Sequence, residues 1–86
     1  MYKLLDFYAN WCGPCKMMSP IIEELKEDRA LEIQKIDIDI NEELVREFGI
    51  MSVPTIILLK DNREVDRHSG FISKHDLQNW IKKHMD

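Results

Sequence analysis

The two cysteines of this chain, Cys12 and Cys15, are separated only by Gly13 and Pro14 and follow an apolar, aromatic segment. A disulfide that stabilises a small fold usually closes a long loop, whereas a bond between these two would close almost none. The spacing therefore indicates redox chemistry rather than a structural cross-link. It also predicts that a strand ends just before the pair and a helix begins with it, because proline suits the first helical turn.

Hydrophobic patterning predicts the first three elements. Residues 2 to 9 are apolar and aromatic on both faces, as in a central strand that is covered on both sides. Residues 13 to 28 carry an apolar stripe of helical period, made by Met17, Met18, Ile21, Ile22 and Leu25. Residues 31 to 38 alternate in polarity, with one apolar face formed by Ile36, Ile38 and Ile40, and predict a second strand.

The remaining elements follow from turn and cap signals. We expect a short helix capped by Asn41, strands over residues 54 to 59 and 64 to 69, and a last helix that begins at Ser73. The order β-α-β-α-β-β-α predicts an α/β fold with one four-stranded mixed sheet flanked by helices. The first two strands should run parallel, and the third and fourth should be antiparallel neighbours.

Length and composition restrict the domain organisation and the partners. A chain of 86 residues suits one domain that spans residues 1–86. The formal net charge of -4 leaves no basic surplus to neutralise phosphates, so we expect no nucleic-acid partner. The longest apolar run, residues 56–59, is too short for a membrane span, and residues 1–5 do not form a signal peptide. We therefore expect a cytoplasmic monomer.

The predicted position of the cysteines gives each of them a different chemistry. Cys12, at the N-terminus of a helix, lies where free backbone N–H groups and the helix dipole stabilise a thiolate. Cys15 lies one turn further along the same face, so its sulfur can reach that of Cys12. The predicted reaction is attack of the Cys12 thiolate on a substrate disulfide, followed by attack of Cys15 on Cys12 and release of the reduced substrate.

A zinc site is the main alternative explanation of the cysteine pair. Zinc normally needs four protein ligands, and no second pair accompanies these two cysteines. The three histidines are scattered downstream without ligand spacing, at His68, His75 and His84. We therefore expect no metal and no cofactor.

The segment Asp6-Phe7-Tyr8-Ala9-Asn10-Trp11-Cys12-Gly13-Pro14-Cys15-Lys16 resembles the signature stretch of the thioredoxin family. Val53-Pro54-Thr55 resembles the cis-proline loop of that family, Gly70 its later loop glycine and Pro20 its helix-kinking proline. The resemblance runs through the whole chain and implies a thioredoxin-like fold with protein-disulfide reductase activity. Thioredoxins proper usually begin with an extra strand and helix, so we interpret the sequence as a minimal member of glutaredoxin-like size.

The resemblance also implies roles for residues around the cysteines. Asp6, in the middle of a predicted central strand, would exchange a proton with Cys15 through water, and burial would raise its pKa. Lys35 would pair with Asp6 from the adjacent strand. The residues expected to contact substrate are Trp11, Gly13, Pro14, Val53, Pro54 and Gly70, with a cis Val53-Pro54 bond and a Val53 backbone that binds an extended peptide.

Several alternatives stay open at this point. Asp6 and Lys35 could be solvated strand residues, and Pro54 could simply open a strand. The expected partners are protein disulfides and an upstream reductase such as thioredoxin reductase. A glutaredoxin-like protein reduced by glutathione is a close rival, because the chain is short. A binding module with incidental redox chemistry is a rival from another class.

Overall fold

The structure is a computed structural model that describes residues 1–85, in which four strands and three helices follow one another. The elements are β1 (Tyr2–Tyr8), α1 (Gly13–Leu25), β2 (Leu31–Asp37), α2 (Glu42–Phe48), β3 (Thr55–Lys60), β4 (Arg63–Ser69) and α3 (Lys74–Met85). This order confirms the predicted α/β fold, although α1 ends earlier than expected. No helix within the described part of the chain is long and apolar enough to cross a membrane.

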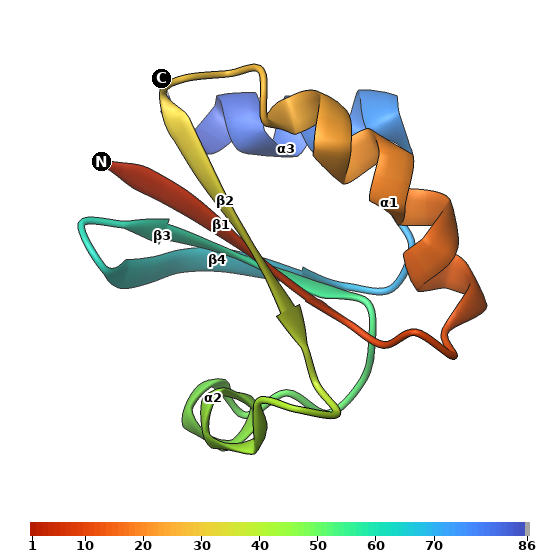
Figure 1. Cartoon of the computed structure of the whole chain (residues 1–86). Coiled ribbons are helices and arrows are strands. Elements are labelled where there is room, and N and C mark those ends of the chain that lie inside the picture. Colours follow the sequence, from red (N-terminus) through yellow and green to blue (C-terminus); the bar gives the residue numbers. More distant parts are fainter. Residues whose placement is uncertain (86) are drawn as a thin grey trace.

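The sheet has the strand order β2-β1-β3-β4 (Figure 1). The two central strands are β1 and β3, which run antiparallel to each other. As predicted, β1 and β2 run parallel, while β3 and β4 are antiparallel neighbours. The carboxyl ends of β1 and β2 therefore lie at the same end of the sheet, and the segment that carries both cysteines leaves β1 there.

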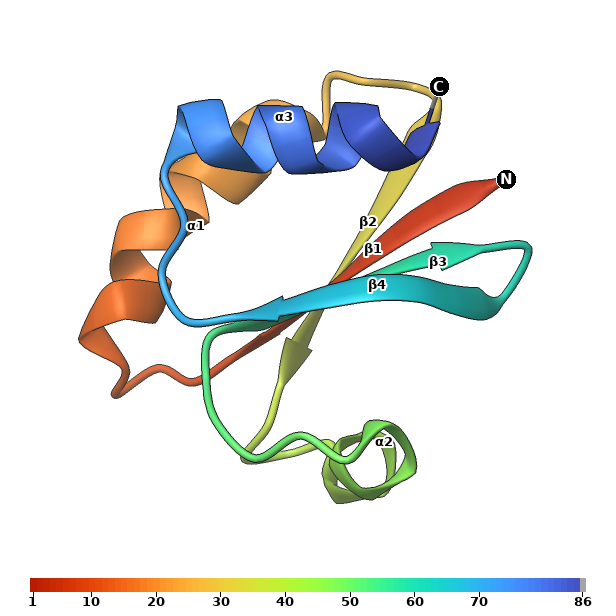
Figure 2. The ribbon, with the colours of Figure 1, turned by 180° about the vertical axis from the view of Figure 1, so that it is seen from behind.

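Helices cover both faces of the sheet. Figure 1 and the reverse view in Figure 2 show α1 and α3 on one face and α2 alone on the other. The core under α1 and α3 is built from Leu4, Met18, Ile22, Leu31, Ile56, Leu58, Ile72, Leu77 and Ile81. The core under α2 is built from Leu5, Phe7, Ile36, Ile57 and Leu59.

The alternation of side chains along β1 fixes where its one carboxylate points. Leu4 belongs to the core under α1 and α3, whereas Leu5 and Phe7 belong to the core under α2. Successive side chains of a strand point to opposite faces, so Asp6 shares the face of Leu4. The fold thus buries an ionisable group beneath α1, the helix that begins with the cysteine pair.

Three local predictions were wrong. Asn41 is the N-cap residue of α2, but its side chain does not make the expected cap bond, and its amide donates to the Asp37 carbonyl oxygen at 2.9 Å. Met17 lies at the margin of the α1 stripe and is 62% exposed, while Met18 is buried. Ile40 lies beyond the end of β2, where the strand alternation no longer applies, and is 79% exposed. By contrast, the predicted cap at Ser73 accepts a hydrogen bond from the Asp76 N–H.

Candidate active site

Cys12 and Cys15 are joined by a disulfide at the start of α1, with 5.2 Å between their Cα atoms. Cys12 is the N-cap residue of the helix, and its sulfur accepts a 3.2 Å hydrogen bond from the Cys15 backbone N–H. The short loop after β1 is closed by a 3.2 Å hydrogen bond from the Cys12 N–H to the Ala9 carbonyl oxygen. Both cysteines are buried, with 5% and 6% of their surface exposed. The cysteine pair therefore lies between the end of β1 and the start of α1, as the sequence predicted.

Trp11 lies directly before the pair and is 67% exposed. Its indole N–H donates a 3.0 Å hydrogen bond to Asp39, which follows the end of β2. The neighbouring Asn10 amide donates to the Asp37 carboxylate at 3.3 Å. Our sequence reasoning did not single out Asp37 or Asp39. The available signal was their position at the end of a strand parallel to β1, Asp37 as its last residue and Asp39 just beyond it, since the carboxyl ends of parallel strands meet at one edge.

The loop before β3 reaches the same end of the molecule. Val53 packs against the cluster formed by Ala9 and the two cysteines. The Val53-Pro54 peptide bond is cis, as expected. Gly70, which has a φ of +94°, donates a 2.8 Å hydrogen bond from its N–H to the Pro54 carbonyl oxygen. The structure thus brings Val53, Pro54 and Gly70 to the cysteine end of the sheet.

Gly13 and Pro14 both lie on the exposed surface between the cysteines. A Cβ atom placed on Gly13 would meet no atom of this protein within 4 Å. The fold itself therefore does not require glycine at this position. A docking partner that approaches the sulfurs closely would gain from the absence of a side chain.

Asp6 is only 4% exposed, and burial raises its pKa to about 6 against the opposing effect of Lys35. A small cavity of about 210 Å³ connects Asp6 with Cys15, and it is lined by Asp6, Tyr8, Ala9, Asn10, Cys15, Lys16, Ser19 and Lys35. A carboxyl group with this pKa changes its protonation in the range where many enzymes work. The geometry therefore allows proton exchange with Cys15 across the cavity.

Lys35 lies next to Asp6 in the sheet register, as the sequence suggested, but the direct pairing is not formed. The ion pairs of residues 1–85 include none between these two side chains. Instead, the Lys35 ammonium is 3.4 Å from the Ser19 hydroxyl oxygen and 5.0 Å from the centre of the Tyr8 ring. Lys35 thus influences Asp6 through space, while its ammonium contacts two other side chains.

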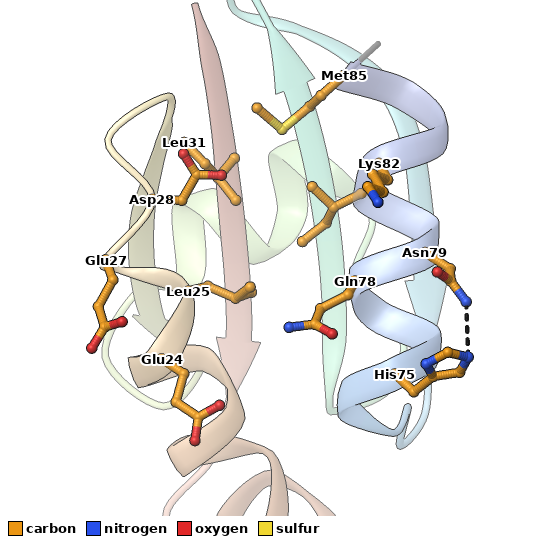
Figure 3. A pocket seen from close by; sticks show the side chains of 11 residues that line it. Glu24, Leu25, Glu27, Asp28, Leu31, His75, Gln78, Asn79, Lys82 and Met85 are labelled. Atoms are coloured by element: carbon orange, nitrogen blue, oxygen red, sulfur yellow. Dashed lines mark hydrogen bonds between the residues drawn. The ribbon is translucent and has the colours of Figure 1, made fainter.

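A larger groove, of about 840 Å³, lies away from the cysteines between the C-terminal half of α1 and α3 (Figure 3). Glu24, Glu27 and Asp28 line its α1 side, and none of the predicted site residues lines it. On the α3 side, His75 and Asn79 are joined by a hydrogen bond. Within residues 1–85, no group of three or more histidine, cysteine, aspartate and glutamate side chains is arranged to hold a metal ion.

Comparisons with known proteins agree with this arrangement. The family model described as Thioredoxin matches residues 2–83. The thioredoxin of Bacillus subtilis is 46% identical over 84 residues, an alignment that covers 95% of this chain and 81% of that protein. Among solved structures, a mutant thioredoxin from Halobacterium salinarum has a TM-score of 0.92 and 36% identity, covering 99% of this chain and 75% of that chain. A structure described as a malarial protein has a TM-score of 0.91 and 39% identity, covering 100% of this chain and 99% of that chain.

Proposed function

The chain belongs to the thioredoxin family, and from this we propose that Cys12 is its attacking thiolate and Cys15 its resolving thiol. The chain is a thiol–disulfide oxidoreductase that reduces protein disulfides, and a reductase returns it to the dithiol form. The observation that carries the residue assignment is the Cys12–Cys15 disulfide at the N-terminus of α1. The roles below extend this activity to particular side chains.

In the first step, the Cys12 thiolate attacks one sulfur of a substrate disulfide. A bond forms between Cys12 and that sulfur, the substrate disulfide breaks, and the other substrate sulfur leaves as a thiolate. The N-terminus of α1 supports this role of Cys12, because its free N–H groups stabilise negative charge. The residues that we propose to contact the substrate are Trp11, Gly13, Pro14, Val53, Pro54 and Gly70.

In the second step, Cys15 attacks the Cys12 sulfur of the mixed disulfide. We assign Asp6 as the group that accepts the Cys15 proton, through water in the cavity that both side chains line. The intramolecular disulfide then forms, and the second substrate sulfur leaves and takes up a proton. The net result is transfer of two electrons from the dithiol to the substrate. Lys35 modulates this step through its charge.

The partners of this reaction follow from the same proposal. We assign thioredoxin reductase, or a reductase of similar kind, as the upstream donor, and we propose that residues 1–86 work as one monomeric domain in the cytoplasm. The support for this compartment is that both cysteines of the chain form the redox pair, as expected where structural disulfides are rare. The acidic net charge of -4 and the short apolar runs support the proposal that the protein binds neither nucleic acid nor a membrane.

A comparison of two electron donors tests the proposal. The oxidised protein is supplied either with NADPH and a bacterial thioredoxin reductase or with glutathione and glutathione reductase, and NADPH consumption is followed with insulin as the disulfide substrate. We expect sustained turnover with thioredoxin reductase and little with glutathione. Efficient turnover with glutathione alone would instead identify a glutaredoxin-like protein. Full cellular function of a Cys12→Ser, Cys15→Ser double variant would identify a binding module.

A further inference from the structure

The side chain of Ser19 also lines the cavity that Asp6 and Cys15 share. Ser19 lies four residues after Cys15 on α1, so the two side chains project from the same face of the helix. Both line the cavity together with Asp6 and Lys35. The Ser19 hydroxyl oxygen accepts a hydrogen bond from the Lys35 ammonium at 3.4 Å. One turn of α1 therefore carries both the resolving cysteine and a contact to the nearby lysine.

The Lys35 ammonium has one further contact and a competing preference for water. The face of the Tyr8 ring is 5.0 Å from the Lys35 nitrogen, within the range of a cation–π interaction. Lysine side chains are flexible, and a partly exposed lysine keeps its charged end in water unless something holds it. A charge held inside a cavity also acts more strongly on its neighbours than the same charge in bulk water. The position of the ammonium thus controls how strongly it acts on Asp6.

We propose that Ser19 is a positioning residue whose hydroxyl, together with the Tyr8 ring, holds the Lys35 ammonium inside the cavity and so sets how readily Asp6 takes up the proton of Cys15. This rests on the proposed role of Asp6. Without the hydroxyl, the ammonium moves toward water and supports the ionised form of Asp6 less. Ser19 acts through Lys35 and takes no direct part in the exchange between the sulfurs.

The other groups around Asp6 leave Lys35 as the route for this effect. From α1, the titratable or charged side chains that line the cavity are Cys15 and Lys16, and Lys16 is exposed. β1 itself contributes Tyr8, and the register partner of Asp6 on β3 is the apolar Ile56. Lys35 is the cationic group that opposes the effect of burial on the pKa of Asp6.

The direct test is the titration of Asp6 in the oxidised protein, followed by the carboxyl carbon signal in NMR. We expect the Asp6 carboxyl of the Ser19→Ala variant to titrate at higher pH than that of the wild type, by about half a pH unit. The reason is that the Lys35 ammonium moves away from it and stabilises its ionised form less. Ser19→Thr keeps the hydroxyl and should restore the wild-type midpoint. Lys35→Gln should also raise the midpoint, and adding Ser19→Ala to it should then have no further effect.

Two results would overturn the proposal. One is an unchanged or lower midpoint in Ser19→Ala, and the other is a further shift when Ser19→Ala is added to Lys35→Gln. Because the titration uses the disulfide form, its outcome does not depend on turnover. The proposed role of Asp6 is tested separately, by the pH dependence of release from the mixed disulfide in Asp6→Asn. If Asp6→Asn releases substrate like the wild type from pH 6 to 9, the proton-transfer role fails even where the Ser19 tether is real.

Discussion

The backbone N–H of Cys15 donates a 3.2 Å hydrogen bond to the sulfur of Cys12. The bond places the Cys12 sulfur at the N-terminus of α1, where it acts as the helix cap. A thiolate at this place would accept the same bond more strongly, since hydrogen bonds to ionised acceptors are stronger than neutral ones. Exposure does not separate the two sulfurs, because the residues are 5% and 6% exposed. Position on the helix is therefore what distinguishes the cysteine that we propose to attack from the one that we propose to resolve.

The first prediction concerns the order of the two cysteines. A Cys15→Ser variant keeps the attacking sulfur but lacks the thiol that resolves the mixed disulfide, so it should accumulate a covalent adduct with a disulfide-containing protein. Intact-protein mass spectrometry after mixing with excess oxidised substrate measures the adduct. The matched Cys12→Ser variant should give none. A stable adduct on Cys15 in the latter, with none on Cys12 in the former, would reverse the assignment.

The second prediction concerns the stability cost of Asp6. Its pKa is raised from 3.8 to about 6 by burial, so the folded protein binds a proton more tightly than the unfolded chain. The free energy of unfolding should therefore fall as pH rises from 3.8 through about 6, by up to roughly 3 kcal/mol from this group, and should stay low above that range.

Asp6→Asn removes the charge while it keeps the shape of the side chain. We expect urea unfolding at pH 8 to show this variant to be more stable than the wild type by about 1 to 3 kcal/mol, with the difference much reduced near pH 4. Glu32→Gln, a change at an exposed residue of β2 that forms a surface ion pair with Lys3, serves as the control and should shift stability little at either pH. An Asp6→Asn variant that is less stable at pH 8 would mean that the carboxylate is well solvated in the fold.

The third prediction separates two glycines of the site. Gly70 has a φ of +94°, a conformation that costs an L-residue about 1 to 2 kcal/mol, so Gly70→Ala should lower stability by about that amount. It should also lower the rate of substrate reduction, because the Gly70 N–H is hydrogen-bonded to Pro54.

Gly13→Ala is the matched comparison for this change. Nothing in the protein lies within 4 Å of the added Cβ, so thermal unfolding should show stability that is equal or higher by up to about 1 kcal/mol. If Gly13→Ala has an effect, it should therefore be a lower rate of reaction with protein disulfides and not a lower stability. Equal destabilisation by both changes would contradict the assignment of backbone strain to Gly70 alone.

The fourth prediction concerns the attachment of α3 to the edge strand β4. One oxygen of Asp66 accepts a 3.1 Å hydrogen bond from the Trp80 indole and lies 2.7 Å from His84 Nε2, while its other oxygen accepts from the Arg67 backbone N–H. Partial burial acts to raise the pKa of Asp66, but the hydrogen bonds from Arg67, His84 and Trp80 hold it below its usual value. The stabilisation is therefore present above the ordinary pKa of 3.8 and is lost as pH falls through the lower, folded-state value.

Asp66→Ala should lower the free energy of unfolding by about 1 to 2 kcal/mol at pH 7, a modest figure because the carboxylate is partly exposed. The loss should be smaller near pH 3, where the wild type also gives up part of these bonds. Chemical denaturation at the two pH values measures both. Glu64→Gln weakens only a surface ion pair with Arg67 and should cost less than about 1 kcal/mol. Equal losses of unfolding free energy in the two variants would show that the hydrogen bonds of Asp66 contribute no more than a surface ion pair.

The sequence predicted the element order well because strong periodicity and cap signals coincide with the elements. The apolar and aromatic run of β1 and the Gly13-Pro14 start of α1 are local features that the folded structure keeps. The cis bond at Val53-Pro54 could be predicted only from the resemblance to a family, because a proline in a sequence does not by itself indicate a cis bond. Local patterns were therefore sufficient where local and tertiary preferences agree.

Other parts of the site depend on contacts between segments that lie far apart in the chain. The failed side-chain cap at Asn41 is a different, local case, because its amide donates to the carbonyl oxygen of Asp37 only four residues earlier. The contact between Lys35 and Ser19 joins β2 to α1, and no spacing in the sequence encodes it. The bond from Trp11 to Asp39 likewise appears only once two parallel strands end side by side.

The most direct measurement of the central claim is a single turnover with a protein disulfide. The fully reduced protein, freed of other thiols, is mixed with excess insulin, and both protein thiols and released insulin thiols are counted by alkylation and mass spectrometry. We predict that one insulin disulfide is reduced for each Cys12–Cys15 disulfide formed, and that Cys12→Ser reduces none. Reduction at the wild-type rate by Cys12→Ser, or oxidation of the cysteine pair without insulin thiols appearing, would contradict the account.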